Sequence, residues 1–198
     1  MVKYRNTPTN GIMFSQLVNL GSVLGKEGSI KGWDYRMGSY LKNISQKIVL
    51  DLGCGLGSSF ILFLKERGYH PKELIHLDAN LSLFFTERPS NEHKLFYPEV
   101  KELFYDWNSD GRIIADAENI PLESRSVDII NQNMMFADNP ELNENKAMGE
   151  INRILKKGGI YIDSGEIEAD SYMGIFNESF KKLNTFNVYR KIKENIEY

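Results

Sequence analysis

The sequence predicts an α/β fold in which helices cover both faces of a doubly wound, mostly parallel sheet. Short, nearly continuous apolar runs recur along the chain, and such runs are typical of strands that are buried on both faces. Helical segments separate these runs, and strands that alternate with helices favour parallel pairing through crossover connections. A chain of 198 residues is long enough for one such domain and short for two.

The first predicted strand–helix–strand unit contains three elements in order: a strand at 48–52, a helix at 58–67 that ends at Gly68, and a strand at 74–78. The spacing leaves room for one crossover helix and its two loops. We therefore expect Asp51 and Asp78 to lie near the ends of two parallel strands.

The second half of the sheet follows from later segments: strands at 112–116, 127–131 and 160–163, a helix at 143–155, and a Lys-Lys-Gly-Gly turn at 156–159. Beyond Asp163 we expect a helix at 170–183 and one strand within 185–193, and the last strand of the sheet looks missing or vestigial. Such a shortened C-terminal end leaves an edge that either pairs with another copy or is covered by the basic tail, unless that tail is simply a solvated face. The expected state is a monomer or a homodimer.

Two regions fall outside the alternating pattern. Residues 1–45 contain one predicted helix and several spaced glycines, which predicts an N-terminal cap or lid ahead of a main domain at 46–198. Within that domain, an aromatic-rich stretch near 82–111 is longer than a crossover needs. We expect it to fold as an inserted element.

The composition bounds the function. A net charge of -3 and a predicted pI of 5.7 disfavour a nucleic-acid partner. The single cysteine, Cys54, excludes an internal disulfide, and no cysteines or histidines have zinc-site spacing, so no metal is expected. The start of the chain lacks the apolar stretch of a signal peptide, and no apolar run is long enough to span a bilayer, so a cytoplasmic protein is expected.

Three glycines at alternate positions indicate a ligand-binding turn. Gly53, Gly55 and Gly57 follow a predicted buried strand and precede a predicted helix. A glycine in such a turn lets a ligand approach the backbone and permits backbone angles that other residues resist. An acid at the end of the next strand, Asp78, can accept two hydrogen bonds from ribose hydroxyls. This combination predicts a nucleoside-containing cofactor.

Four segments together resemble the class I S-adenosylmethionine-dependent methyltransferase family, of the small-molecule, type 11-like kind. They are the stretch at 49–57, Asp78, the stretch at 115–117 and the stretch at 150–159. The resemblance covers residues 47–163 and implies the Rossmann-like class I methyltransferase fold, methyltransferase activity and S-adenosyl-L-methionine as the cofactor.

The resemblance also implies a set of cofactor-binding residues: Asp51, Gly53, Cys54, Gly55, Gly57, Asp78, Ala79, Asp116, Ala117 and Asn131. The glycine loop would face the methionine part of the cofactor, and Asp51 would reach its amino group. Asp78 would hold the ribose. Asp116 would accept a hydrogen bond from the adenine amino group, and the Ala117 N–H would face a ring nitrogen. Asn131 would border the methyl group.

No residue stands out as a catalytic base. Methyl transfer from a sulfonium is an in-line displacement on an activated donor, so alignment can supply much of the acceleration. The candidates for a base or an orienting group are Tyr35, Asn133 and Asp138, with Tyr40 and Glu141 as further possibilities. His76 lies inside a predicted strand and is expected to be a satisfied core histidine.

The acceptor is expected to be a small molecule. The segment at 131–136 lacks the Asn-Pro-Pro-aromatic or Asp-Pro-Pro-aromatic signature of enzymes that methylate nucleobase amines. Two alternatives stay open from the sequence. One is a non-catalytic S-adenosylmethionine-binding module that regulates a partner. The other is a nicotinamide-dependent oxidoreductase, because a Gly-x-Gly loop followed by an acid also occurs in dinucleotide-binding proteins.

Overall fold

A computed structural model describes residues 37, 39–54, 59–79, 111–132, 135–136, 141–163, 178–183 and 187–193. Its elements in chain order are a 3-10 helix (Ile44–Gln46), β1 (Ile48–Leu52), α2 (Ser59–Glu66), β2 (Glu73–Asp78), β3 (Gly111–Ile114), β4 (Val127–Gln132), α6 (Glu144–Ile154), β5 (Leu155–Asp163), β6 (Phe180–Lys182) and β7 (Val188–Lys191).

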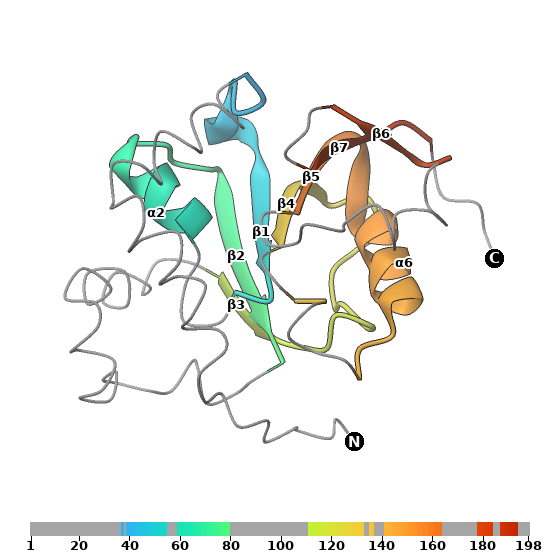
Figure 1. Cartoon of the computed structure of the whole chain (residues 1–198). Coiled ribbons are helices and arrows are strands. Elements are labelled where there is room, and N and C mark those ends of the chain that lie inside the picture. The colour runs from blue at the N-terminus through green and yellow to red at the C-terminus, as the bar shows by residue number, and fades with distance from the viewer. Residues whose placement is uncertain are drawn as a thin grey trace, which may run out of the picture.

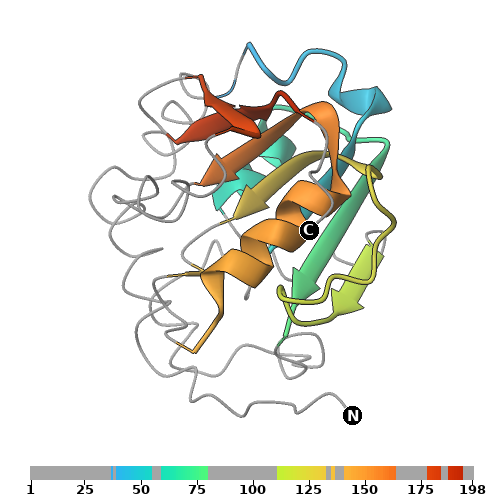
Figure 2. The same cartoon turned by 90° about the vertical axis from the view of Figure 1, so that its right-hand side faces the viewer.

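The strands form one seven-stranded sheet in the order β3-β2-β1-β4-β5-β7-β6 (Figure 1). Strands β1 to β5 pair in parallel, whereas β7 runs antiparallel to both β5 and β6. Helices α2 and α6 cover opposite faces of the sheet (Figures 1 and 2). The predicted doubly wound, mostly parallel α/β fold is confirmed.

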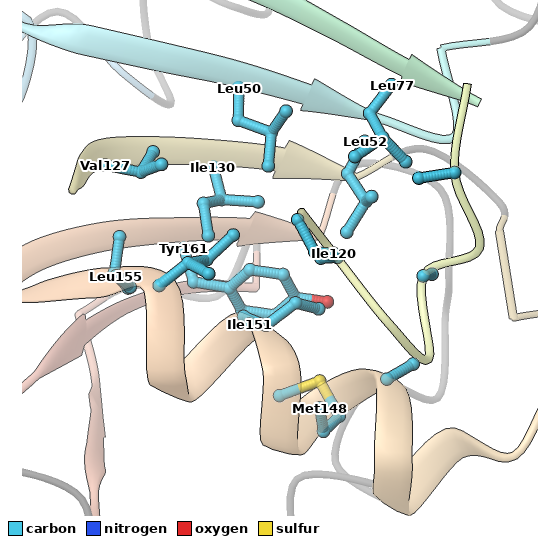
Figure 3. Close-up of a cluster of buried hydrophobic side chains, with 14 of the residues drawn as sticks. Leu50, Leu52, Leu77, Ile120, Val127, Ile130, Met148, Ile151, Leu155 and Tyr161 are labelled. Carbon is cyan, nitrogen blue, oxygen red and sulfur yellow. The ribbon is translucent and has the colours of Figure 1, made fainter. Parts of the chain in front are cut away.

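Alternate residues of the central strands supply the two cores. Leu50, Leu52 and Ile130 face α6, where they pack with Tyr161 and Ile151 (Figure 3). The intervening residues belong to a second apolar cluster that includes buried side chains of α2, among them Val49, Ile129, Phe60 and Phe63. Burial on both faces explains why these strands appear in the sequence as nearly continuous apolar runs.

Helix α2 ends where the sequence predicts. The N–H of Gly68 donates to the carbonyl of Lys65 at 3.0 Å, and the N–H of Tyr69 donates to the carbonyl of Leu64 at 2.8 Å. Gly68 has a φ of 64°, the left-handed conformation that this pair of hydrogen bonds requires. The Tyr69 ring packs edge-on against Phe63, 5.8 Å between centroids, which fixes the direction of the chain toward β2.

Helix α6 begins at a side-chain cap, because the Asn143 carboxamide accepts the N–H of Lys146 at 3.1 Å. The expected turn at 156–159 is instead an irregularity inside β5. The pairing with β4 jumps from Val127↔Leu155 to Ile129↔Ile160, so extra residues of β5 bulge between these two pairs. The glycines make this bulge feasible, since Gly158 has a φ of 81°.

The last strand of the sheet, expected to be missing or vestigial, is present but only three residues long. Both antiparallel strands are present, and β6 occupies the edge of the sheet. The strand is hard to see in the sequence because it has three residues, and two of them, Lys181 and Lys182, are exposed. It occupies the end of the predicted helix at 170–183, which is therefore wrong at residues 180–182; residues 170–177 lie outside the described part.

Two other predicted regions are mostly outside the described residues. The cap at 1–45 is described only at residue 37 and from residue 39, and of the insertion near 82–111 only Gly111 is described, as the first residue of β3. Within the described residues, no helix is both long and apolar enough to cross a membrane.

Candidate functional site

The predicted site residues gather at the carboxyl ends of the parallel strands. Asp51 and Asp78 lie at the ends of β1 and β2, and Asn131 lies near the end of β4. The chain order of the strands reverses between β1 and β4, and this switch point is where open α/β sheets bind ligands. The fold thus places residues that are 80 positions apart in the sequence at one edge of the sheet.

A buried polar row crosses the sheet at this edge. Asp51 is directly opposite His76 on β2 and Asn131 on β4. The Asn131 carboxamide nitrogen donates to Asp51 Oδ1 at 2.7 Å, and His76 Nδ1 lies 3.7 Å from Asp51 Oδ2. All three side chains are at most 1% exposed. A carboxylate so deeply buried needs hydrogen-bond partners, and within this row Asn131 supplies one to Oδ1.

The turn after β1 is shaped by Gly53. Its φ is 65°, and a Cβ built at this position would lie 3.2 Å from the Cβ of Met135. The N–H groups of Gly53 and Cys54 both donate to the carbonyl of Leu77, at 2.8 and 3.2 Å, which ties the turn to β2. The two later glycines of the motif, Gly55 and Gly57, lie outside the described residues.

Cys54 is a buried thiol rather than an exposed nucleophile. Burial raises its pKa well above the ordinary value, and the nearby carboxylates of Asp78 and Asp51 raise it further. The thiol is therefore protonated at neutral pH, and a protonated buried cysteine is a poor nucleophile. Its observed place is that of a small packed side chain within the turn.

The two cofactor-site candidates at the end of β2 differ in exposure. Asp78 is buried, and its carbonyl accepts the N–H of Ala115 at 3.1 Å, which joins the ends of β2 and β3. Ala79, the next residue, is exposed.

The loop after β3 begins with a tight turn. Asp116 is exposed, its carboxylate accepts the N–H of Glu118 at 2.9 Å, and its carbonyl accepts the N–H of Asn119 at 3.0 Å. Ala117 is buried in the core cluster on the α6 face. The local hydrogen bond to Asp116 is the kind that fixes turns, so this carboxylate has a structural role in addition to any role toward a ligand.

The structure describes only two of the five candidates for a catalytic role. Tyr35, Asn133 and Asp138 lie outside the described residues. Tyr40 is described, but its segment leads into the start of β1, at the opposite end of the sheet from the site (Figure 1). Glu141 is exposed, shortly before α6. Among the described residues, no group of three or more histidine, cysteine, aspartate or glutamate side chains could hold a metal ion.

Sequence reasoning missed the pairing of His76 with Asp51. It placed His76 in the core, where the structure also has it, but the side chain that it faces depends on the register between β1 and β2. In the structure both residues are the fourth of their strands, but the predicted strand at 74–78 begins one residue late, so this signal was off by one position in the sequence. It becomes informative only once the two strands are known to be neighbours.

Comparison with known proteins places these observations in a family. Residues 50–163, more than half of the chain, match the family model described as a methyltransferase domain. A search of curated protein sequences finds no match.

Three solved structures with the same fold have low sequence identity to this chain. A candidate S-adenosyl-L-methionine-dependent methyltransferase from Methanococcus maripaludis has a TM-score of 0.55 and 15% identity, over 93% of this chain and 92% of that one. The CurJ carbon methyltransferase has a TM-score of 0.60 and 15% identity, over 94% of this chain and 60% of that one, so this chain spans less than two thirds of its length. The MccD protein has a TM-score of 0.51 and 18% identity, over 78% and 71%.

The strand order distinguishes the methyltransferase interpretation from that of a nicotinamide-dependent oxidoreductase. The best-known dinucleotide-binding sheet has the strand order 3-2-1-4-5-6 and is mostly parallel. Here an antiparallel strand, β7, lies between β5 and β6. The sheet therefore differs from the one expected for a nicotinamide-dependent oxidoreductase.

Proposed function

We propose that this chain, which belongs to the methyltransferase-domain family and is an S-adenosylmethionine-dependent methyltransferase, transfers the methyl group to a small-molecule acceptor. The observation that carries the proposed site is the buried Asp51 carboxylate beneath the Gly53 turn, at the switch point of the sheet. The proposal has two parts, the placement of the cofactor and the class of acceptor.

The chemistry of these residues fits the cofactor. S-adenosylmethionine has a cationic ammonium group and a cationic sulfonium centre, and the sulfonium supplies an activated methyl group. Asp51 and Asp78 place two carboxylates at the edge of the sheet where the ligand would lie. We assign Asp51 to the ammonium group and Asp78 to the ribose hydroxyls, because ionised carboxylates form strong hydrogen bonds to both kinds of donor.

Asn131 fits a supporting role in this arrangement. Its side chain is fully buried and donates to Asp51 Oδ1. This hydrogen bond fixes the rotation of the carboxylate, so that Asp51 is oriented before the ligand arrives. Fixed orientation of this kind lowers the cost of binding.

We assign the loop after β3 to the adenine base of the cofactor. The proposed contacts are the Asp116 carboxylate with the adenine amino group and the Ala117 N–H with a ring nitrogen. The exposure of Asp116 supports this assignment, as does the turn that fixes its carboxylate. The chain would thereby hold the cofactor from the end of β1 to the end of β3.

The residues of this chain would promote transfer by alignment. A methyl group held in line with an acceptor reacts as in an intramolecular step, which is worth on the order of 7–11 kcal/mol of the barrier. Gln132, buried at the end of β4, and Met135, packed against Gly53, come from the segment that would border the acceptor.

A small acceptor is supported by charge and by sequence. A net charge of -3 gives no general attraction to a phosphate backbone. The residues that follow Asn131 also lack the Pro-Pro-aromatic pattern of nucleobase amine methylation. Both observations weigh against a nucleic-acid substrate.

The exposed lysines of β6 bear on the oligomeric state. An edge strand with charged side chains discourages pairing with a second copy. We therefore propose that the enzyme acts as a monomer.

The first test is calorimetric titration with S-adenosylhomocysteine, with NADH as a control. We expect micromolar binding of S-adenosylhomocysteine and none of NADH. Binding of NADH alone would contradict the cofactor site.

The second test identifies the acceptor class. The enzyme is incubated with cell extract and S-adenosylmethionine labelled in the methyl group, and the extract is then separated into small molecules, nucleic acid and protein. Label in the small-molecule fraction that requires active enzyme supports the proposal. Label confined to nucleic acid or protein would refute a small acceptor while leaving the cofactor site intact.

A further inference from the structure

A charged pair on α6 holds the loop between β3 and β4. The Glu150 carboxylate accepts the N–H of Ile120 at 2.7 Å. The Arg153 guanidinium donates to the carbonyls of Ile120 and Leu122, both at 2.7 Å. The N–H and the carbonyl of Ile120 are thus both hydrogen-bonded to side chains of α6, some 30 positions away in the sequence.

The pair is itself rigid. Arg153 Nε and Nη2 donate to the two Glu150 oxygens at 2.7 and 2.8 Å, an arrangement with two parallel hydrogen bonds. Their side chains are 30% and 18% exposed, so the contacts are partly shielded from water. Hydrogen bonding to Arg153 lowers the pKa of Glu150, which keeps this carboxylate ionised at neutral pH. Two-point pairs of this kind add geometric specificity as well as energy.

A second contact fixes the same loop closer to its start. Glu118 accepts the backbone N–H of Asn143 at 2.8 Å and lies 3.7 Å from the ammonium group of Lys146. Glu118 also donates its own N–H to the Asp116 carboxylate. Glu118 therefore joins the N-cap residue of α6 to Asp116 through one hydrogen bond of its side chain and one of its backbone.

We propose that Glu150 and Arg153 are positioning residues that set the selectivity of the cofactor site for adenine. This inference rests on the proposed assignment of Asp116 and Ala117 to the base. The pair does not contact the ligand; it holds the loop that does.

Selectivity, rather than overall affinity, is the property that this pair should control. Recognition of a base edge requires donors and acceptors held within about 0.5 Å of their working positions. A polar site that is built for one hydrogen-bonding pattern rejects a ligand with the wrong pattern, because the site's own groups are then left unpaired. A loosened loop can rearrange around the wrong base, so it discriminates less.

The test compares S-adenosylhomocysteine with S-inosylhomocysteine, in which a carbonyl oxygen replaces the adenine amino group. Calorimetry gives the dissociation constants of both ligands for the wild type, Arg153→Met and Glu150→Gln. We define selectivity as the ratio of the S-inosylhomocysteine constant to the S-adenosylhomocysteine constant. We expect the ratio to fall roughly tenfold or more in both variants.

Asp128→Asn provides a matched control. Asp128 also accepts a backbone N–H, that of Ile48 at 3.0 Å, and pairs with Lys156 at 2.7 Å. It lies in β4 opposite the start of β1, at the other end of the sheet from the site. Its loss should lower stability without changing the ratio.

The outcomes separate two failures. An unchanged ratio in a folded Arg153→Met variant would overturn the positioning role. If that variant does not fold, the ratio in Glu150→Gln decides in the same way. Failure of the wild type to bind S-adenosylhomocysteine would instead overturn the proposed cofactor site. A ratio that falls equally in Asp128→Asn would show a general effect of lost stability, and this too would overturn the inference.

Discussion

Asp51 is a buried carboxylate at the edge of the sheet where we propose that the cofactor binds. Its side chain is 1% exposed, yet it lies at the end of β1, where the sheet opens toward the turn at Gly53. Asn131 fixes one carboxylate oxygen, while His76 lies beside the other. The hydrogen bond from Asn131 and, in the proposed complex, a cationic ligand offset part of the cost of burying the charge.

Replacement of this charge should weaken cofactor binding more than folding. Asp51→Asn keeps the size of the side chain and an oxygen that can accept from Asn131, but it removes the negative charge. We expect S-adenosylhomocysteine to bind about 10- to 100-fold more weakly, since a hydrogen bond to a charged group is worth about 1.5–3 kcal/mol. Calorimetry measures the affinity, and a thermal melt confirms folding. Wild-type affinity in this variant would refute the assignment.

The glycine at the turn makes a second prediction at the same scale. Gly53→Ala places a side chain at a positive φ and close to Met135, so we expect the free energy of unfolding to fall by about 1–2 kcal/mol. Gly149→Ala is the matched control, because Gly149 lies inside α6, where an added Cβ would meet no atom of another element within 4 Å. That change should stabilise the protein by about 0.5–1 kcal/mol. Urea denaturation measures both, and equal effects would contradict the strain at Gly53.

At the scale of elements, the end of α6 depends on a strand far away in the sequence. The ammonium group of Lys191, on β7, donates to the carbonyls of Asn152 and Leu155 at 2.6 and 2.9 Å. Lys191 is fully buried, although the sequence suggests a basic tail that is solvated or covers the edge of the sheet. A cation at the C-terminal end of a helix satisfies carbonyls that have no partner within the helix.

Loss of this contact should destabilise the whole domain. Lys191→Met keeps much of the apolar stem but leaves both carbonyls without this donor, so we expect a loss of about 2 kcal/mol or more. Lys181→Met, on the exposed side of β6, is the control and should change stability little. Chemical denaturation with both variants checks the difference. Comparable losses would mean that the buried amine contributes no more than a surface lysine.

At the scale of the whole molecule, the sheet brings together the segments that we propose bind the different parts of the cofactor. The ends of β1 and β2 would hold the amino acid and ribose parts of the cofactor, and the loop after β3 would hold its base. The order of the strands brings these three ends together on one side of the switch point, and β4 borders them on the other. Binding should therefore link several elements and stabilise them as a unit.

Ligand binding should raise the melting temperature accordingly. At a concentration 100 times its dissociation constant, a ligand that binds only the folded state adds about 2.7 kcal/mol. For a protein of this size that corresponds to a rise of about 5–10 °C. We expect this rise with S-adenosylhomocysteine and none with NADH, by differential scanning calorimetry. The Asp51→Asn variant should show a smaller rise at the same concentration.

The sequence predicted the fold class, and the strand ends at which we propose the site, from local signals. The run at 48–52, the glycines after it and the acids that end two strands are visible within short windows. It did not predict β6, since three residues with two exposed lysines carry no apolar pattern. It also misjudged Gly158, because a bulge inside a strand and a turn between elements use the same residues.

The sequence by itself determined that this protein is an α/β domain with a glycine turn and two acids at strand ends, and its resemblance to the methyltransferases predicted the cofactor. Only the tertiary structure decided that Asn131 and His76 flank Asp51, that Lys191 closes α6, and that Glu150 and Arg153 hold the loop of Asp116. The physical reason is that these contacts join residues about 25 to 80 positions apart. Strand register and helix placement fix such contacts, and both are properties of the assembled core rather than of any local segment.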